Sequence, residues 1–221
     1  MRAMLKVPFK NAEFLVDPTT IDIELKEREM LDRFWNVKEK DIVFDIGASV
    51  GLYSLAAHAV GAGFVYAFEP DKQKIKDFRA NINYNKAHEK IASVPMGLWS
   101  SETQVYYDMK TASMMGANEV DSQLVPVTTI DRFVNERSAM ISHIDYMKID
   151  VEGAEMEVLK GATNTLMKYK PVLFLEMHHK IVPDILSDVR KFFDDLALHV
   201  DIKEMYLSPT GDTSNVMYTI H

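Results

Sequence analysis

The chain has 221 residues, of which 47% are hydrophobic and 26% are charged, as expected for a globular α/β domain with a full core. It contains no cysteine, which excludes disulfides and thiolate metal sites. The formal net charge of −8 argues against a nucleic-acid partner but allows a small-molecule or sugar substrate. We expect a cytoplasmic protein without a membrane span, because the sequence shows neither a signal-peptide pattern nor a long uninterrupted apolar stretch.

Residues 1–40 are predicted to form an N-terminal extension. Within it, residues 1–20 suggest a short strand or hairpin, and residues 21–35 suggest a helix with one apolar face. Residues 41–221 are expected to form a Rossmann-like core. The whole chain, 1–221, would then be a single domain.

The segment DIVFDIGASVGLYS, residues 41–54, is predicted to form a buried strand, a tight turn and the start of a helix. Gly47 and Gly51 bracket the turn, and apolar residues recur at helical spacing from Leu52 onward. Glycine tolerates a positive φ and lets a ligand approach the backbone closely. Such a unit directs backbone N–H groups and a helix N-terminus toward a ligand.

Asp45 narrows the identity of this ligand. The turn has the form D-x-G-x-x-x-G, which is neither the dinucleotide motif G-x-G-x-x-G nor the P-loop. A carboxylate at this position would repel a pyrophosphate, but it suits the amino group of S-adenosylmethionine (SAM). The alternatives are NAD bound by a degenerate loop and a βαβ unit that binds no cofactor.

Glu69 supports SAM, because it ends the next predicted strand, residues 64–68. It follows Asp45 at close to the spacing of roughly 20 residues that is typical of a ribose-binding acid. We therefore predict SAM as the cofactor. The predicted cofactor-binding residues are Asp45, Gly47, Ala48, Ser49, Gly51, Tyr53, Glu69 and Pro70.

The next segments mostly alternate helix and strand. A helix is predicted after Pro70, and a third strand at residues 91–98. Residues 103–127 suggest two edge strands around the loop TASMMGAN, residues 111–118. We interpret this loop either as a lid over the substrate or as a disordered connection.

In the second half of the chain, the sequence pattern predicts further strands at residues 144–151 and 171–176, with one helix between them. An amphipathic helix follows over residues 182–196, and residues 198–221 suggest a final strand pair. This order predicts the α/β class: a doubly wound, mostly parallel seven-stranded sheet with an antiparallel C-terminal hairpin.

Acidic residues follow several predicted strands, and ligands in open α/β sheets bind at these strand ends. Lys148 and Asp150 project to the same side of one strand, where a buried lysine needs an opposite charge or a ligand. Glu152 and Glu155 follow at a helix start, whose dipole favours anions. The alternative interpretation is a structural ion-pair cluster. The predicted catalytic residues are Lys148, Asp150, Glu152, Glu155, Glu176 and His178.

An alcohol that accepts a methyl group has a high pKa, so it needs a general base or a metal to become nucleophilic. His178 or His179 is a candidate base, and each is otherwise an ordinary solvated histidine. A divalent metal could be held by Asp150, Glu152 or Glu176, because magnesium prefers oxygen ligands. No spacing requires such a metal, and we predict none.

The chain resembles the FkbM-type family of SAM-dependent methyltransferases, which are class I and Rossmann-like. The KIDVEGxE segment is the most specific match, whereas DxGxxxG alone would indicate only the superfamily. The matching segments, in family order, are VFDIGASVGLYS (43–54), YAFEP (66–70), FRANINYN (78–85), VPVTTIDRF (125–133), YMKIDVEGAEMEVLKGA (146–162) and PVLFLEMH (171–178).

This resemblance implies a class I methyltransferase fold and O-methylation of a hydroxyl on a sugar or other small-molecule or glycoconjugate metabolite. Ser49 replaces the asparagine that is usual in the family. Because serine can also donate and accept a hydrogen bond, we expect a modest loss of cofactor binding at most. The alternatives are a SAM-binding regulatory module, a nicotinamide enzyme, and an N- or C-methyltransferase. The family's SAM-binding positions are matched by Asp45, Gly47, Gly51 and Glu69, and its acidic motif by Asp150, Glu152 and Glu155.

Overall fold

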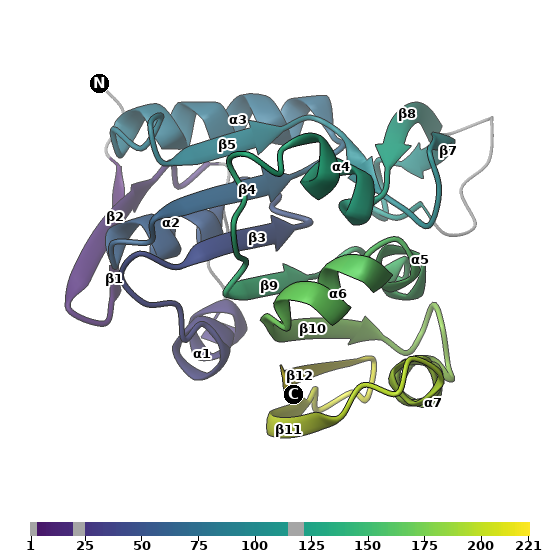
Figure 1. Ribbon diagram of the computed structural model, residues 1–221. Helices are drawn as coiled ribbons and strands as arrows, with labels where there is room; N and C mark the ends of the chain where they lie inside the picture. The colour runs from purple at the N-terminus through teal and green to yellow at the C-terminus, as the bar shows by residue number, and fades with distance from the viewer. Residues whose placement is uncertain (1–3, 20–24, 115–121) are drawn as a thin grey trace. The chain divides into compact units, whose positions relative to one another are not determined.

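The computed structural model describes residues 4–19, 25–114 and 122–221 (Figure 1). By the density of its internal contacts, the chain divides into two compact units, residues 1–95 and 96–221. Within the described ranges, none of the helices has the length and apolar character that crossing a membrane requires.

The first unit begins with an antiparallel hairpin, as predicted, and continues into β-α repeats. Three of its strands, β3, β4 and β5, are parallel neighbours, and α2 and α3 pack along them (Figure 1). The helix predicted at 21–35 begins in residues that lie outside the described part. The elements are β1 (Leu5–Phe9), β2 (Ala12–Val16), α1 (Leu25–Phe34), β3 (Ile42–Ile46), α2 (Leu52–Ala59), β4 (Phe64–Phe68), α3 (Lys72–Tyr84) and β5 (Ile91–Val94).

Asn81 of α3 and Asn85, the C-cap of α3, attach this hairpin to the rest of the first unit. The Asn85 side-chain amide donates to Leu15 O at 2.6 Å and accepts from Leu15 N at 2.7 Å. Asn81 accepts from Asp17 N at 3.0 Å and donates to Val50 O at 3.0 Å. A buried amide that is satisfied on both sides fixes the orientation of the segments it joins. The hairpin is therefore tied both to α3 and to the loop before α2.

The second unit combines a parallel pair with an antiparallel end. Strands β9 and β10 are parallel, and β12 runs antiparallel to both β10 and β11. Helices α5 and α7 pack against β10, while β6, β8 and β7 form a separate small sheet. The elements are β6 (Gly97–Leu98), β7 (Thr103–Asp108), β8 (Ser122–Thr128), α4 (Ile130–Glu136), β9 (Tyr146–Ile149), α5 (Glu155–Lys160), α6 (Thr163–Tyr169), β10 (Val172–His178), α7 (Ile185–Asp195), β11 (Val200–Leu207) and β12 (Thr213–Ile220).

The large sheet has seven strands in the order β11-β12-β10-β9-β3-β4-β5. All pairings that flank β12 are antiparallel, and the β9–β10, β3–β4 and β4–β5 pairings are parallel. The predicted α/β class is therefore confirmed, with a mostly parallel seven-stranded sheet and an antiparallel C-terminal hairpin.

The third predicted strand, residues 91–98, is wrong as a single element. Strand β5 ends at Val94, and Gly97 and Leu98 pair with β8 in the small sheet instead. Pro95 lies between them and has no N–H to continue the hydrogen-bond ladder. The loop predicted at 111–118 is described only as far as residue 114, and its remainder lies outside the described residues.

The helix predicted after the 144–151 strand is also two helices, because the chain breaks between Lys160 and Thr163. The start of α6 is capped by Asp131, which comes from α4. Its carboxylate accepts from Asn164 N at 3.0 Å and Thr165 N at 2.8 Å. Because this cap comes from a distant part of the chain, the helical periodicity alone did not indicate the break.

Candidate active site

The loop between β3 and α2 is shaped by three residues with positive φ: Gly47 at 80°, Ser49 at 50° and Gly51 at 94°. The N–H groups of Gly47 and Ala48 both donate to Phe68 O, at 3.0 and 2.9 Å. These bonds attach the loop to the end of β4. The loop that the sequence assigns to the cofactor is thus a defined backbone turn at two strand ends.

Glu69 connects the same loop to the segment after β4. Its carboxylate accepts from Ser49 N and from Asp71 N, each at 2.9 Å, and the residue is only 3% exposed. Burial raises the pKa of Glu69, and the nearby Lys74 and the two backbone donors oppose that rise. The residue predicted to bind the ribose is therefore a buried carboxylate that backbone N–H groups orient.

Asp45 and Tyr53 are placed within the core of the first unit. Asp45 is 1% exposed and accepts a hydrogen bond from Ser54 Oγ at 2.5 Å, which joins β3 to the first turn of α2. The Tyr53 ring packs edge-on against Trp35, with the centroids 5.2 Å apart. Pro70 is half-buried and follows Glu69 directly. Cofactor contacts for these residues stay predictions.

In the second unit, Lys148 and Asp150 form the pair that their spacing predicts. Lys148 is 1% exposed, and its Nζ lies 2.9 Å from Asp150 Oδ2. Burial of an isolated ammonium is costly, and this contact supplies the compensating charge. Asp150 is held on one oxygen while 24% of its side chain stays exposed.

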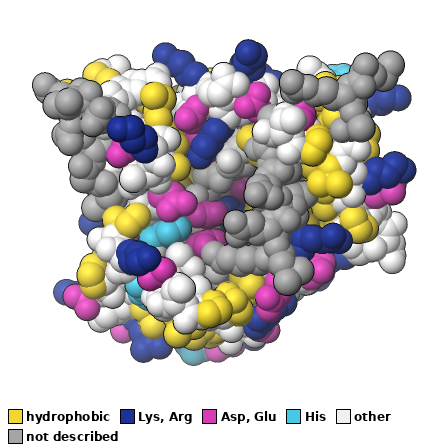
Figure 2. Space-filling view, turned by 180° about the vertical axis from the view of Figure 1, so that it is seen from behind, with side chains coloured by type: hydrophobic (Ala, Val, Ile, Leu, Met, Phe, Trp, Pro, Cys, Tyr) yellow, Lys and Arg dark blue, Asp and Glu magenta, His cyan; other side chains and the backbone are white. Residues whose placement is uncertain are grey.

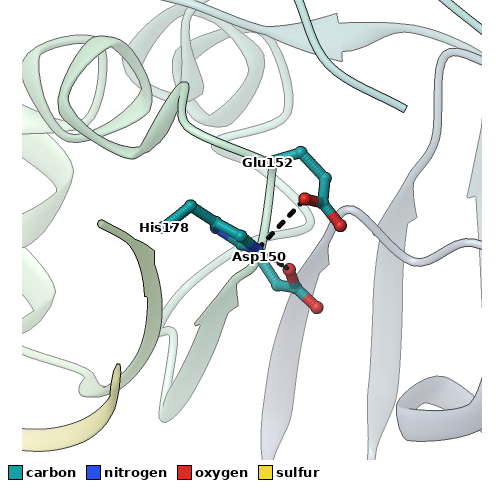
Figure 3. Close-up of side chains that lie close together, drawn as sticks. All are labelled: Asp150, Glu152 and His178. Atoms are coloured by element: carbon teal, nitrogen blue, oxygen red, sulfur yellow. Dashed lines mark ion pairs between the residues drawn. The ribbon is translucent and has the colours of Figure 1, made fainter. Parts of the chain in front are cut away.

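His178 lies at the end of β10 among three carboxylates. Its Nδ1 is 2.7 Å from Glu155 Oε1, and its Nε2 is 3.2 Å from Glu152 Oε2 and 3.9 Å from Asp150 Oδ1. Figure 3 shows the ring directed toward Asp150 and Glu152. Burial lowers the pKa of His178, but the three carboxylates outweigh it and raise the pKa to about 9.

The turn that follows β9 brings these carboxylates together. Glu152 and Gly153 both have positive φ, at 52° and 95°. Glu155 is fully buried and also accepts from Gly153 N at 3.0 Å, so it is held on the side away from the solvent. The hydroxyl of Ser113 donates to Glu152 O at 2.6 Å. Ser113 belongs to the loop 111–118, which the sequence left as either a lid or a disordered connection, and no sequence motif indicated this contact.

The structure separates the two histidines that the sequence left as alternatives. His179 Nε2 lies 2.8 Å from Ser214 Oγ, on the β12 side of the strand, whereas His178 belongs to the acidic group. Glu176 is 6% exposed and pairs in register with Asn215. Because Glu176 and His178 are two residues apart on β10, they share a face of the sheet.

Acidic side chains gather around a histidine on the face of the molecule shown in Figure 2. Among the described residues, one group could hold a metal ion: Asp150, Glu152 and His178 offer ligand atoms that all lie within 4.8 Å of one another. Glu176, which the sequence suggested as a metal ligand, lies outside this group. The group combines oxygen and nitrogen ligands, which suits divalent cations.

Comparison with known proteins decides the family. The Methyltransferase FkbM domain matches residues 45–200 of this chain. The chain belongs to the FkbM methyltransferase family. The FkbM resemblance seen in the sequence is therefore confirmed, and the matched range includes both the glycine loop and the acidic group.

A curated protein resembles this chain in sequence, and solved methyltransferase structures share its fold. The hexuronic acid methyltransferase AglP of Haloferax volcanii is 27% identical, over 76% of this chain and 67% of that protein. A crystal structure of a methyltransferase FkbM from Methylobacillus flagellatus KT has a TM-score of 0.57 and 19% identity. It is matched over 81% of this chain and 44% of that one, so this chain spans less than half of it. The structure of M. jannaschii TYW2 in complex with AdoMet shares the fold, with a TM-score of 0.55, 12% identity and coverage of 98% and 85%.

Proposed function

We propose that this protein is a SAM-dependent O-methyltransferase whose acceptor is a hydroxyl of a sugar or a sugar-derived metabolite. Membership of the FkbM family supports methyl transfer. The relative named as a hexuronic acid methyltransferase supports a sugar acid as the acceptor class. The observation that carries the proposal is the buried Glu69 carboxylate, oriented by the glycine loop.

Glu69 suits a ribose because its acceptor capacity is only partly used by the two backbone donors. An ionised carboxylate offers about four lone-pair sites. The N–H groups of Ser49 and Asp71 occupy one site on each oxygen. The remaining sites suit the two hydroxyls of a ribose, which would bind a carboxylate through charge-assisted hydrogen bonds. In this proposal, Asp45 and the Gly47–Gly51 loop hold the amino acid end of SAM.

The acidic group of the second unit is proposed to bind and activate the acceptor. The acceptor oxygen attacks the sulfonium methyl carbon, the carbon–sulfur bond breaks, and S-adenosylhomocysteine leaves. The hydroxyl proton passes to a carboxylate. Asp150 is 24% exposed, whereas His178 is 10% exposed and is bound by Glu155 at Nδ1, so we assign proton acceptance to Asp150 and a positioning role to His178.

The remaining predicted residues support this group. Lys148 holds the far oxygen of Asp150, and Glu155 holds the far nitrogen of His178. We assign Glu152 and Glu176 to the acceptor hydroxyls, since carboxylates are strong acceptors for sugar hydroxyls. The single-domain organisation and the cytoplasmic location stay predictions.

The test uses the purified chain, SAM labelled on its methyl group, and matched pairs of sugars: glucuronate with glucose, and galacturonate with galactose. We expect label in a sugar product, at a rate that Asp150→Asn lowers by about 100-fold or more while SAM affinity stays unchanged. A wild-type turnover rate in Asp150→Asn would contradict the role given to Asp150. A folded protein that binds neither SAM nor its demethylated product would contradict the function itself.

A further inference from the structure

The three side chains at the end of β9 and β10 have the geometry of a shared ion site. Glu152 Oε2 and Asp150 Oδ1 lie 3.2 and 3.9 Å from His178 Nε2, and all the ligand atoms lie within 4.8 Å of one another (Figure 3). Ligands that bind one cation at about 2.1 Å lie roughly 3 to 4 Å apart. The ion would therefore fit among these atoms with only small side-chain adjustments.

Two of these three ligands are held from behind by other side chains. Glu155 is fully buried and binds His178 Nδ1 at 2.7 Å, which directs Nε2 toward the carboxylates. Lys148 binds Asp150 Oδ2 at 2.9 Å, which leaves Oδ1 on the histidine side. Metal-binding histidines and carboxylates typically have such partners on the atom that does not ligate. The arrangement directs Asp150 Oδ1 and His178 Nε2 toward each other.

Charge also favours a divalent cation. In direct contact are three carboxylates, Asp150, Glu152 and Glu155, and two cationic groups, Lys148 and His178. The carboxylates outnumber the cationic groups in this set, so a divalent cation would bind where negative charge is in excess.

The group is open on one side, as a site that exchanges ligands requires. The side chains of Asp150 and Glu152 are 24% and 41% exposed, whereas that of His178 is only 10% exposed. Three protein ligands would leave about three positions of an octahedral ion for water or acceptor oxygens.

We propose that Asp150, Glu152 and His178 form a binding site for one divalent cation of the class of Mn²⁺ or Mg²⁺. Two oxygens and one imidazole nitrogen suit Mn²⁺ best among hard cations, because it accepts both ligand types. The role of the ion rests on the proposed function: it would bind adjacent oxygens of a sugar acid and lower the pKa of the acceptor hydroxyl.

The test is calorimetric titration of the full chain, freed of metal with EDTA and then dialysed, with Mn²⁺ in the absence of SAM and acceptor. We expect one saturable site in the wild type. Asp150→Asn, Glu152→Gln and His178→Gln should each weaken it by about 10-fold or more. Glu152 is half-exposed, so its variant keeps the test sound if the more buried His178 variant fails to fold.

His221→Gln is the matched control, because His221 lies 3.0 Å from Asp201 in a solvent-exposed histidine–carboxylate pair. Its Mn²⁺ affinity should equal that of the wild type. The proposal is overturned if the folded wild type shows no saturable Mn²⁺ binding at millimolar concentration, or if the three variants bind like the control. Methyl transfer that persists in EDTA would overturn the role of the ion and leave the proposed function intact. Mn²⁺ binding without SAM binding would overturn the proposed function and leave the metal site intact.

Discussion

The carboxylate of Glu69 balances burial against hydrogen bonding. Its folded-state pKa is raised, with burial as the largest cause, although two backbone N–H groups and Lys74 favour the charged form. The residue therefore costs folding free energy when it ionises. A bound ribose would add two donors and offset that cost, so we expect SAM binding to release a proton at mildly acidic pH.

The raised pKa of Glu69 gives a prediction about stability and pH. Because its folded pKa exceeds the unfolded value, its stabilising contribution is full below the unfolded pKa and is lost as pH rises through the folded pKa. In urea unfolding without SAM, the stability of the wild type relative to Glu69→Gln should fall as pH rises above about 4, the ordinary pKa of a glutamate. A difference that rises over this range would contradict the assignment.

Residue contacts show what the sequence could and could not reveal at the site. The spacing of Asp45 and Glu69 and the Lys148–Asp150 pair follow from the two-residue strand period and the βαβ pattern, which are local properties. The choice of His178 over His179 depends on Glu155, which lies on another element. Periodicity carries no information about such a contact.

Among the elements, the junction between α5 and α6 packs closely against Trp99 at Gly161. A Cβ at this position would lie 2.1 Å from Trp99 O, a backbone atom that cannot rotate away. Gly161→Ala should therefore destabilise the protein by about 1–3 kcal/mol in urea unfolding. The control is Met167→Ala on α6, a side chain that is 48% exposed and whose loss should change stability by less than about 0.5 kcal/mol. Equal stabilities for the two variants would contradict the role of Gly161.

The N-terminal hairpin depends on Asn81 of α3. Its side chain is fully buried, accepts a hydrogen bond from Asp17 N and donates one to Val50 O. Asn81→Ala therefore removes the side-chain partner of two backbone groups. We expect a loss of about 2–4 kcal/mol in urea unfolding. Asn83→Ala on the same helix is exposed and should have little effect. A small loss at Asn81 would show that water replaces these bonds.

Element types could largely be predicted, and each miss has a structural cause. Buried strands and the amphipathic α7 have clear periodicities. The third predicted strand is interrupted at Pro95, which has no N–H to donate to the ladder. The helix after β9 was split by a cap from Asp131, a residue some thirty positions earlier. Asp131 lies in the VPVTTIDRF segment, and nothing in that segment indicates which helix its side chain contacts.

At the scale of the whole molecule, the two units carry different proposed tasks. The residues assigned to SAM, from Asp45 to Pro70, all belong to the first unit, and the acidic group of Asp150 and His178 belongs to the second. Variants in the two units should therefore affect different measured quantities. Those in the first should weaken SAM binding, and those in the second should lower turnover at saturating SAM.

The measurement that tests the central claim most directly is calorimetric titration of SAM into the wild type, Glu69→Ala and Asp150→Asn. We expect one site in the wild type, with a Kd on the order of micromolar. Glu69→Ala should lose about 1–3 kcal/mol of binding free energy, the value of charge-assisted hydrogen bonds, and Asp150→Asn should bind like the wild type. If Glu69→Ala, shown to be folded, binds SAM as tightly as the wild type, the cofactor site is not where this account places it.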